Sequence, residues 1–134
     1  MDNCIFCKIV KCELPSYKVY EDDKFLAFLS IGPHRMGHTL IIPKEHADYY
    51  FDLSEEDLKE MVTVQKKLAY AIKKAFNPKS GKVGVIVAGL EVPHAHLHLI
   101  PMDEMEDLNF GNSMRDISKA QFLKSQTSLK EALT

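Results

Sequence analysis

Three histidines occupy every second position of the segment VPHAHLHLIP, at His94, His96 and His98, in a chain of 134 residues that contains six histidines. Side chains alternate along a strand, so an extended VPHAHLHLIP would place the three imidazoles on one face, about 6.6 Å apart. Near neutral pH an imidazole is largely uncharged and offers one lone pair and one N–H. Such a row of imidazoles is suited either to bind a metal ion or to attack phosphorus.

Attack on phosphorus sets conditions that the middle histidine meets best. One ring nitrogen must be protonated and bonded to an acceptor, so that the other nitrogen presents its lone pair. Donors must also lie close enough to hold the negative charge that develops on the phosphoryl oxygens. His96 has a histidine on each side, and we therefore predict that it is the nucleophile.

The amino-terminal cysteines indicate a second kind of site. Cys4 and Cys7 have the C-x-x-C spacing of many zinc sites, and zinc needs two further ligands. His34 and His38 have a spacing like the second half of a zinc finger, but the proline and glycine around them disfavour the helix that a finger uses. The alternative is a pair of reduced thiols. Cys12 has no assigned partner.

The elements that position these residues can be read from pattern and capping. The segments LPSYKVYED and KFLAFLSI predict a hairpin, HTLIIP a third strand, GKVGVIVAG a buried strand, and AHLHLIP the neighbour of that strand. A long helix begins after Ser54, whose hydroxyl can cap its first turn, and ends at Asn77 and Pro78. Its predicted apolar stripe consists of Leu58, Met61, Val62, Leu68, Ala69, Ile72, Ala75 and Phe76.

A second, short helix is expected at the carboxyl end. Ser118 and Gln121 have the spacing of a capping box, and Phe122, Leu129 and Leu133 follow as its apolar residues. The sum predicts an α+β fold with a mainly antiparallel sheet of about five strands, one long helix and a short C-terminal helix.

Length and charge limit the kinds of protein that this can be. We expect a single domain over residues 1–134, since the chain is too short for two ordinary domains. A formal net charge of -2 argues against binding of nucleic acid. No apolar stretch is long enough for a membrane span or a signal peptide, so we expect a cytoplasmic protein with no membrane partner.

Several blocks of the sequence together resemble a known family. VPHAHLHLIP is similar to the His-x-His-x-His motif of the histidine triad (HIT) family of nucleotidyl hydrolases and transferases. CIFCKIVKCELPSYKVYEDDKFLAFLSI and GHTLIIPKEH match the same family in order and spacing. The resemblance covers residues 4–101, implies a HIT-like fold, and leaves residues 102–134 as an extension without a clear counterpart.

The resemblance implies a two-step displacement at the α-phosphorus of a purine nucleotide. His96 would form a nucleotidyl-histidine intermediate and water would release the nucleoside monophosphate, with phosphoramidates or adenylates as substrates and dinucleoside polyphosphates as the second choice. His98 and His38 match histidines that bind the phosphoryl oxygens or pass a proton to the leaving group. The nucleoside would lie against Ile5, Phe6, Ile9, Phe28 and Ile31.

The resemblance also implies a structural zinc ion, no magnesium requirement, and a homodimer. In members of the family that carry the cysteines, the zinc ligands match Cys4, Cys7, His46 and His94. Two positions depart from the family: Ser30 stands where an Asp usually bonds the ribose hydroxyls, and Leu90 stands where a Gln helps to hold the phosphate. Gly89 can still let the backbone approach the phosphate closely.

Two other classes of function remain open on sequence alone. In a zinc hydrolase, His94, His96 or His98 would bind a catalytic metal ion that activates water. In a nucleotide-binding or interaction module, the departures at Ser30 and Leu90 would have weakened catalysis.

Overall fold

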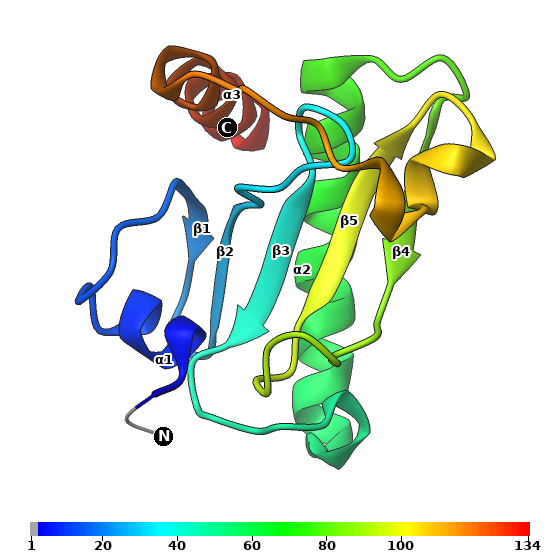
Figure 1. Ribbon diagram of the computed structural model, residues 1–134. Coiled ribbons are helices and arrows are strands. Elements are labelled where there is room, and N and C mark those ends of the chain that lie inside the picture. The colour runs from blue at the N-terminus through cyan, green and yellow to red at the C-terminus, as the bar shows by residue number, and fades with distance from the viewer. Residues whose placement is uncertain (1–2) are drawn as a thin grey trace.

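The protein is described here by a computed structural model that covers residues 3–134 and contains one five-stranded antiparallel sheet, in the order β1-β2-β3-β5-β4 (Figure 1). The strands are β1 (Lys18–Glu21), β2 (Phe25–Leu29), β3 (Thr39–Pro43), β4 (Lys82–Ile86) and β5 (Leu97–Met102). The helices are α1 (Ile5–Val10), α2 (Glu55–Phe76) and α3 (Lys119–Leu133), with short 3-10 turns η1 (Tyr50–Asp52), η2 (Met105–Leu108) and η3 (Phe110–Asn112). The predicted α+β class is confirmed.

The long helix α2 begins and ends where its caps predict. The Ser54 hydroxyl accepts a hydrogen bond from the Asp57 N–H at 3.1 Å, and Asn77 ends the helix in the left-handed conformation. Val62 does not belong to the buried stripe and is 56% exposed. One residue on from the buried Met61, it is rotated by about 100° to the outer face. The residues that α2 buries are Met61, Val64, Leu68, Ala71 and Ile72.

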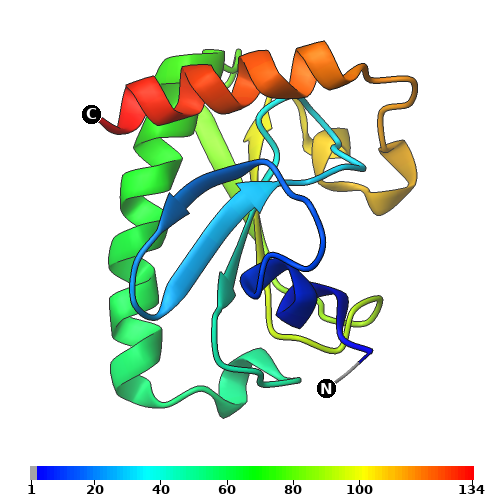
Figure 2. The same cartoon turned by 90° about the vertical axis from the view of Figure 1, so that its left-hand side faces the viewer.

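The sheet is covered differently on its two faces. Figure 2 shows α2 and α3 together, and α1 on the opposite side of the sheet from α2. The α2 face carries alternate strand residues packed into the main core, namely Phe25, Ala27, Leu29, Ile41, Leu97 and Leu99. The other face carries Leu26, Phe28, Leu40 and Ile42, which pack with Phe6 and Ile9 of α1. The histidines lie on this second face.

Strand β4 departs from its prediction. GKVGVIVAG reads as a buried strand, but β4 lies at the edge of the sheet beside β5, and Val85 is 52% exposed. β-Branched residues favour any strand, central or edge, so this composition alone does not reveal which strands neighbour it.

Strand β5 starts later than predicted, at Leu97, so that only His98 of the three histidines lies in it. The pairing with β3 ends at Leu97 because the chain before it bonds elsewhere: the Ala95 N–H donates to the Ala47 carbonyl at 2.6 Å, and the His94 ring bonds to the Pro43 carbonyl. The rings of His94 and His96 still share one side, since both contact the Phe6 ring edge-on.

The carboxyl end packs onto the same core. Ser118 and Gln121 form the predicted capping box, and α3 runs for 15 residues, longer than the short helix expected. Phe122 stacks on Tyr17 with ring centroids 4.9 Å apart, and Leu129 is fully buried. Helix α1 had no sequence prediction. Within the described part of the chain, none of the helices has the length and apolar character that a bilayer crossing requires.

Candidate functional site

A cavity of 520 Å³ opens on the α1 face of the sheet and is bordered by three of the predicted catalytic or binding histidines, His38, His96 and His98. The structure brings the predicted nucleoside residues to the same cavity, namely Ile5, Phe6, Ile9, Phe28, Ser30 and Ile31. Gly89 lies at a smaller adjoining cavity of 170 Å³, which His96 and His98 also line. The two cavities therefore meet at the same pair of imidazoles.

The state of the His96 ring follows from its hydrogen bond. Nδ1 of His96 lies 2.7 Å from the carbonyl oxygen of His94, and a carbonyl can only accept, so Nδ1 carries the proton. In the neutral ring Nε2 then has the free lone pair. His96 is buried yet lines both cavities. This is the arrangement that a histidine nucleophile needs.

His98 and His38 form a directly bonded pair. Nε2 of His38 lies 2.9 Å from Nδ1 of His98, and Nδ1 of His38 accepts the backbone N–H of His34 at 3.1 Å. The proton of neutral His38 is therefore on Nε2, which donates to His98, and the proton of neutral His98 is on its own Nε2. His98 thus offers an N–H donor from the atom that is not used in the pair.

Burial keeps this pair uncharged at neutral pH. Desolvation, with smaller contributions from His98 and His34, lowers the pKa of His38 to about 3. Desolvation, followed by His96 and His34, lowers the pKa of His98 to about 4. At pH 7 the His98 ring is a neutral hydrogen-bond donor, and its cationic form is scarce.

Two aromatic rings that contact the His38–His98 pair were not predicted as site residues. His34, considered only as a finger ligand, is buried beside His38, with ring centroids 4.8 Å apart. Phe110 comes from η3 and contacts His34 and His98 edge-on, at 5.0 and 5.1 Å. The i, i+4 spacing of His34 and His38 around a turn was an available signal. For Phe110 the sequence carries none, because its contact depends on how residues 103–117 fold back over β5.

Few charged side chains of the described residues line the two cavities. Among residues 3–134, the side chains that line the two cavities include no Lys or Arg and one carboxylate, Glu91, which borders both. Ser30, at the position where a carboxylate was expected from the family, accepts the Gly32 N–H at 3.3 Å and adds no charge. A ligand with several negative charges would meet no cationic side chain from the described residues in these cavities.

The four residues predicted to bind zinc lie together beside this cavity. The ligand atoms of Cys4, Cys7, His46 and His94 all lie within 4.8 Å of one another. Sγ of Cys4 is 3.3 Å from Nδ1 of His94, and Sγ of Cys7 is 3.2 Å from Nδ1 of His46. A tetrahedral zinc ion separates sulfur and nitrogen ligands by about 3.5 Å, so the donor set fits zinc. In the described residues this is the one such group.

The surroundings of the four ligands agree with that fit. Nε2 of His94 donates to the Pro43 carbonyl at 2.8 Å, which leaves Nδ1 free to face the thiols, as is usual around metal-binding histidines. Burial and the neighbouring Cys4 raise the pKa of the Cys7 thiol, a cost that a bound cation would remove. Cys12 is exposed and lies apart from the group, beside the Lys18 ammonium.

Comparison with known proteins identifies relatives of the whole fold. The family model of the HIT domain matches residues 11–105. The chain is 44% identical over 112 residues to adenosine 5'-monophosphoramidase HNT1 of Saccharomyces cerevisiae, which covers 81% of this chain and 68% of that protein.

Two solved structures are similar over nearly the full length. A zinc-bound histidine triad family protein of Mycobacterium smegmatis has a TM-score of 0.82 at 30% identity and covers 98% of this chain and 94% of its own. A hypothetical histidine triad nucleotide-binding protein of Sulfolobus tokodaii has a TM-score of 0.84 at 33% identity, and the match covers 97% of this chain and 91% of that protein. These matches extend beyond residue 101, into the segment for which the sequence resemblance offered no clear counterpart.

Proposed function

This chain belongs to the HIT domain family, and we propose that it is a nucleotidyl hydrolase that releases a nucleoside monophosphate from purine nucleoside phosphoramidates or adenylates. The observation that carries the proposal is the hydrogen bond from Nδ1 of His96 to the His94 carbonyl. It leaves the Nε2 lone pair available in a ring that borders both cavities. The name of the yeast relative supports a phosphoramidate as substrate.

The reaction proceeds in two displacements at one phosphorus atom. In the first, Nε2 of His96 forms a bond to phosphorus while the bond to the leaving nitrogen breaks, and its electron pair stays on that nitrogen, which takes one proton from solvent and departs as an amine. In the second, a water oxygen attacks the same phosphorus, its proton returns to solvent, and the phosphorus–Nε2 bond breaks. His96 is restored and the nucleoside monophosphate leaves.

His98 and His38 stabilise the phosphoryl group in this scheme. The Nε2–H of His98 donates to a phosphoryl oxygen, and this hydrogen bond becomes stronger as negative charge develops on that oxygen. We assign His98 hydrogen bonding rather than proton transfer, because its pKa of about 4 leaves little of the acidic form at neutral pH. His38 holds the His98 ring in place through the 2.9 Å bond between them.

The charge of the cavity favours an amine over a polyphosphate as leaving group. A dinucleoside polyphosphate expels a nucleotide with several negative charges, and no Lys or Arg among the described residues lines either cavity to receive it. Glu91 would repel such a group and attract a cationic amine. Phosphoramidates therefore remain the preferred substrates, and dinucleoside polyphosphates the second choice.

The structural zinc ion is part of the proposal. Cys4, Cys7, His46 and His94 would supply all four positions of a tetrahedron, which leaves none for substrate, so zinc would contribute folding energy and no step of the reaction. The name of the mycobacterial structure supports zinc as the metal. The rings of His94, His96 and His98 bond to different partners rather than facing one point, which disfavours a catalytic metal on the triplet. The proposed mechanism uses no magnesium.

A homodimer would explain the exposed edge of the sheet. Strand β4 is an edge strand that pairs only with β5 within the described residues, and Val85 and Val87 are 52% and 37% exposed. Natural proteins seldom leave an apolar edge strand open, because it can pair with another chain. A second copy pairing along β4 would bury these side chains.

Intact-protein mass spectrometry tests the reaction directly. The wild-type protein, mixed with adenosine 5'-phosphoramidate and quenched within seconds, should carry an acid-labile adduct of one adenylyl group. His96→Ala should show none, and Cys12→Ser, altered at an exposed thiol outside the cavities, should behave as wild type. An adduct that persists in His96→Ala, or turnover without any adduct, would refute the proposed nucleophile. A binding module would retain nucleotide without turnover in both proteins.

A further inference from the structure

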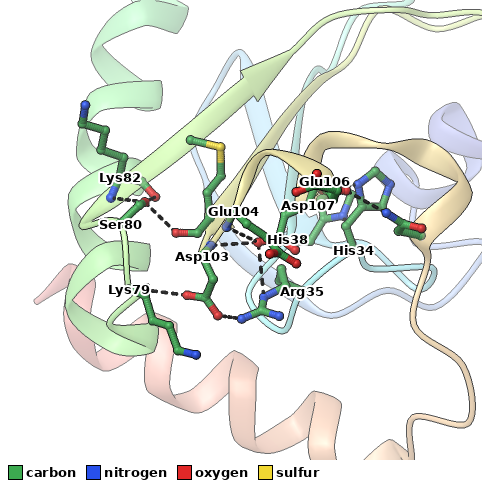
Figure 3. Close-up of polar contacts among 12 residues, drawn as sticks. His34, Arg35, His38, Lys79, Ser80, Lys82, Asp103, Glu104, Glu106 and Asp107 are labelled. Atoms are coloured by element: carbon green, nitrogen blue, oxygen red, sulfur yellow. Dashed lines mark hydrogen bonds and ion pairs between the residues drawn. The ribbon is translucent and has the colours of Figure 1, made fainter.

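The turn before β3 is bonded to the segment that follows β5. Nδ1 of His34 donates to the carbonyl oxygen of Asp107 at 2.8 Å, and both residues are buried. Arg35 forms ion pairs with the carboxylates of Asp103 and Asp107, as Figure 3 shows. We call residues 103–110 the anchor segment, since Asp103 and Asp107 bond to the turn formed by residues 34–38.

Asp107 organises the anchor segment itself. One of its carboxylate oxygens accepts the backbone N–H groups of Asp103 at 2.8 Å and Glu104 at 3.1 Å. Asp103 in turn accepts the Lys79 N–H at 2.7 Å, which ties the segment to the turn that follows α2 (Figure 3). Asp107 thus combines three roles: it closes η2, pairs with Arg35, and offers its carbonyl to His34.

The anchored turn decides the direction of the His38–His98 hydrogen bond. A bond between two neutral imidazoles can run either way, with either ring as the donor. Here the His34 backbone N–H points at Nδ1 of His38, so that this nitrogen must accept and Nε2 must donate. If the turn opened, His38 could hold its proton on Nδ1 and accept from His98 instead. The Nε2 atom of His98 would then lose its proton.

We propose that Asp107 and His34 are positioning residues that set the tautomers of His38 and His98 by holding the His34 backbone N–H on Nδ1 of His38. The catalytic consequence rests on the hydrolase function proposed above. With the turn held, His98 donates to the phosphoryl oxygen through Nε2–H. With the turn released, the same atom offers a lone pair to that oxygen and repels it.

The test compares two variants with a matched control. His34→Phe keeps a ring against Phe110 but removes the donor to the Asp107 carbonyl. Asp107→Ala removes the carboxylate that closes η2. Glu106→Ala deletes a neighbouring exposed carboxylate of the same 3-10 turn and is the control for charge and local helix propensity.

Long-range ¹H–¹⁵N correlation spectra of the histidine rings give the first readout and need no substrate. The wild type and Glu106→Ala should show the Nε2–H form for both His38 and His98. His34→Phe and Asp107→Ala should show signals shifted towards the Nδ1–H form for both rings. In turnover of adenosine 5'-phosphoramidate, kcat should fall by about tenfold with KM within about twofold, as expected for a misoriented group that acts in the transition state.

The two readouts separate failure of this inference from failure of the proposed function. Unchanged Nε2–H signals in His34→Phe would overturn the inference, and this variant decides the question if Asp107→Ala does not fold. A loss of kcat without any change in the tautomer signals would also overturn it, because a general loosening of the structure would explain that result. Shifted signals in a protein that shows no turnover in its wild-type form would support the positioning role and refute the hydrolase.

Discussion

The carbonyl oxygen of His94 lies 2.7 Å from Nδ1 of His96, while the His94 ring points the other way, towards the thiols of Cys4 and Cys7. One residue therefore contributes its side chain to the proposed zinc site of Cys4, Cys7, His46 and His94, and its backbone carbonyl to the proposed nucleophile His96. Any change that moves His94 in the proposed zinc site also moves its carbonyl oxygen, which accepts from Nδ1 of His96 and fixes the tautomer of that ring. The proposed zinc site and the large cavity are thus connected through the backbone of His94.

Loss of a cysteine ligand should consequently reduce both metal content and activity. Cys7→Ser is expected to lower bound zinc, measured by elemental analysis, from about one ion per chain to well below one, and to lower the Tm by about 10 °C, because metal binding contributes folding energy. Turnover below the Tm should fall several-fold without vanishing. Cys12→Ser should match wild type. Equal zinc content in the two variants would contradict the assigned ligands.

The buried His38 should make stability depend on pH. Its pKa is lowered from an ordinary 6.5 to about 3 in the folded protein, so between these values the unfolded chain binds a proton that the folded chain does not. Its contribution to stability is complete above pH 6.5 and is lost as the pH falls towards 3. From pH 7 to pH 5 the free energy of unfolding should drop by about 2 kcal/mol more in wild type than in His38→Gln, measured by urea denaturation. If the free energy of unfolding changes equally with pH in wild type and His38→Gln, the pH dependence does not come from His38.

The turn that carries His38 requires glycine at position 37. Gly37 has φ +98°, and an added Cβ would lie 2.6 Å from a ring carbon of Phe76. Gly37→Ala should cost about 1–2 kcal/mol for the left-handed backbone and about 1–3 kcal/mol more for the overlap. Gly81→Ala, with φ +70° and open space around the Cβ, should show the backbone cost alone. If Gly37→Ala and Gly81→Ala lose the same free energy of unfolding in urea denaturation, the Phe76 ring moves aside at no cost.

Replacement of Glu91, the one carboxylate that residues 3–134 place at the cavities, should change the preferred leaving group. Glu91→Lys is expected to raise kcat/KM for diadenosine tetraphosphate relative to adenosine 5'-phosphoramidate by about fivefold, the effect of a charge interaction of about 1 kcal/mol near solvent. Glu131→Lys, on α3, makes the same change of charge away from the cavities. An unchanged ratio in Glu91→Lys would remove the charge argument for an amine leaving group.

The open edge of the sheet makes the oligomeric state testable. Val85→Lys should shift the protein towards monomer in sedimentation velocity experiments, because it places a charge where a second β4 would pair. Val62→Lys alters a side chain of similar exposure, 56% against 52%, on the outer face of α2, and should leave the assembly unchanged. A wild-type protein that sediments as a monomer at high concentration would contradict the proposed dimer.

Local signals predicted the elements that local interactions determine. Ser54 and Asn77 at the ends of α2, the hairpin of β1 and β2, and the Ser118–Gln121 capping box all act within a few residues of the chain, and each lies where the sequence indicated. The set of four proposed zinc ligands was predicted from the family resemblance. Spacing alone offered only Cys4 and Cys7.

Features that depend on distant parts of the chain were missed. The edge position of β4 depends on which strands find each other, and a β-branched run does not encode that choice. Asp107 reads as one more acidic residue in a polar stretch, yet it is buried, and its carboxylate accepts two backbone N–H groups of its own segment and pairs with Arg35 from a distant one. Phe110 reaches His98 only after residues 103–117 have folded back.

The large cavity is walled by residues on both sides of the histidine triplet in the sequence, since Ile5 and Phe6 precede the triplet and Phe110 and Ser113 follow it. During synthesis, a ribosome would have to deliver Ser113 before those walls could close. The histidine triplet leaves the exit tunnel before Phe110 and Ser113, so a nascent chain carries the three imidazole rings for a time without that part of the cavity wall.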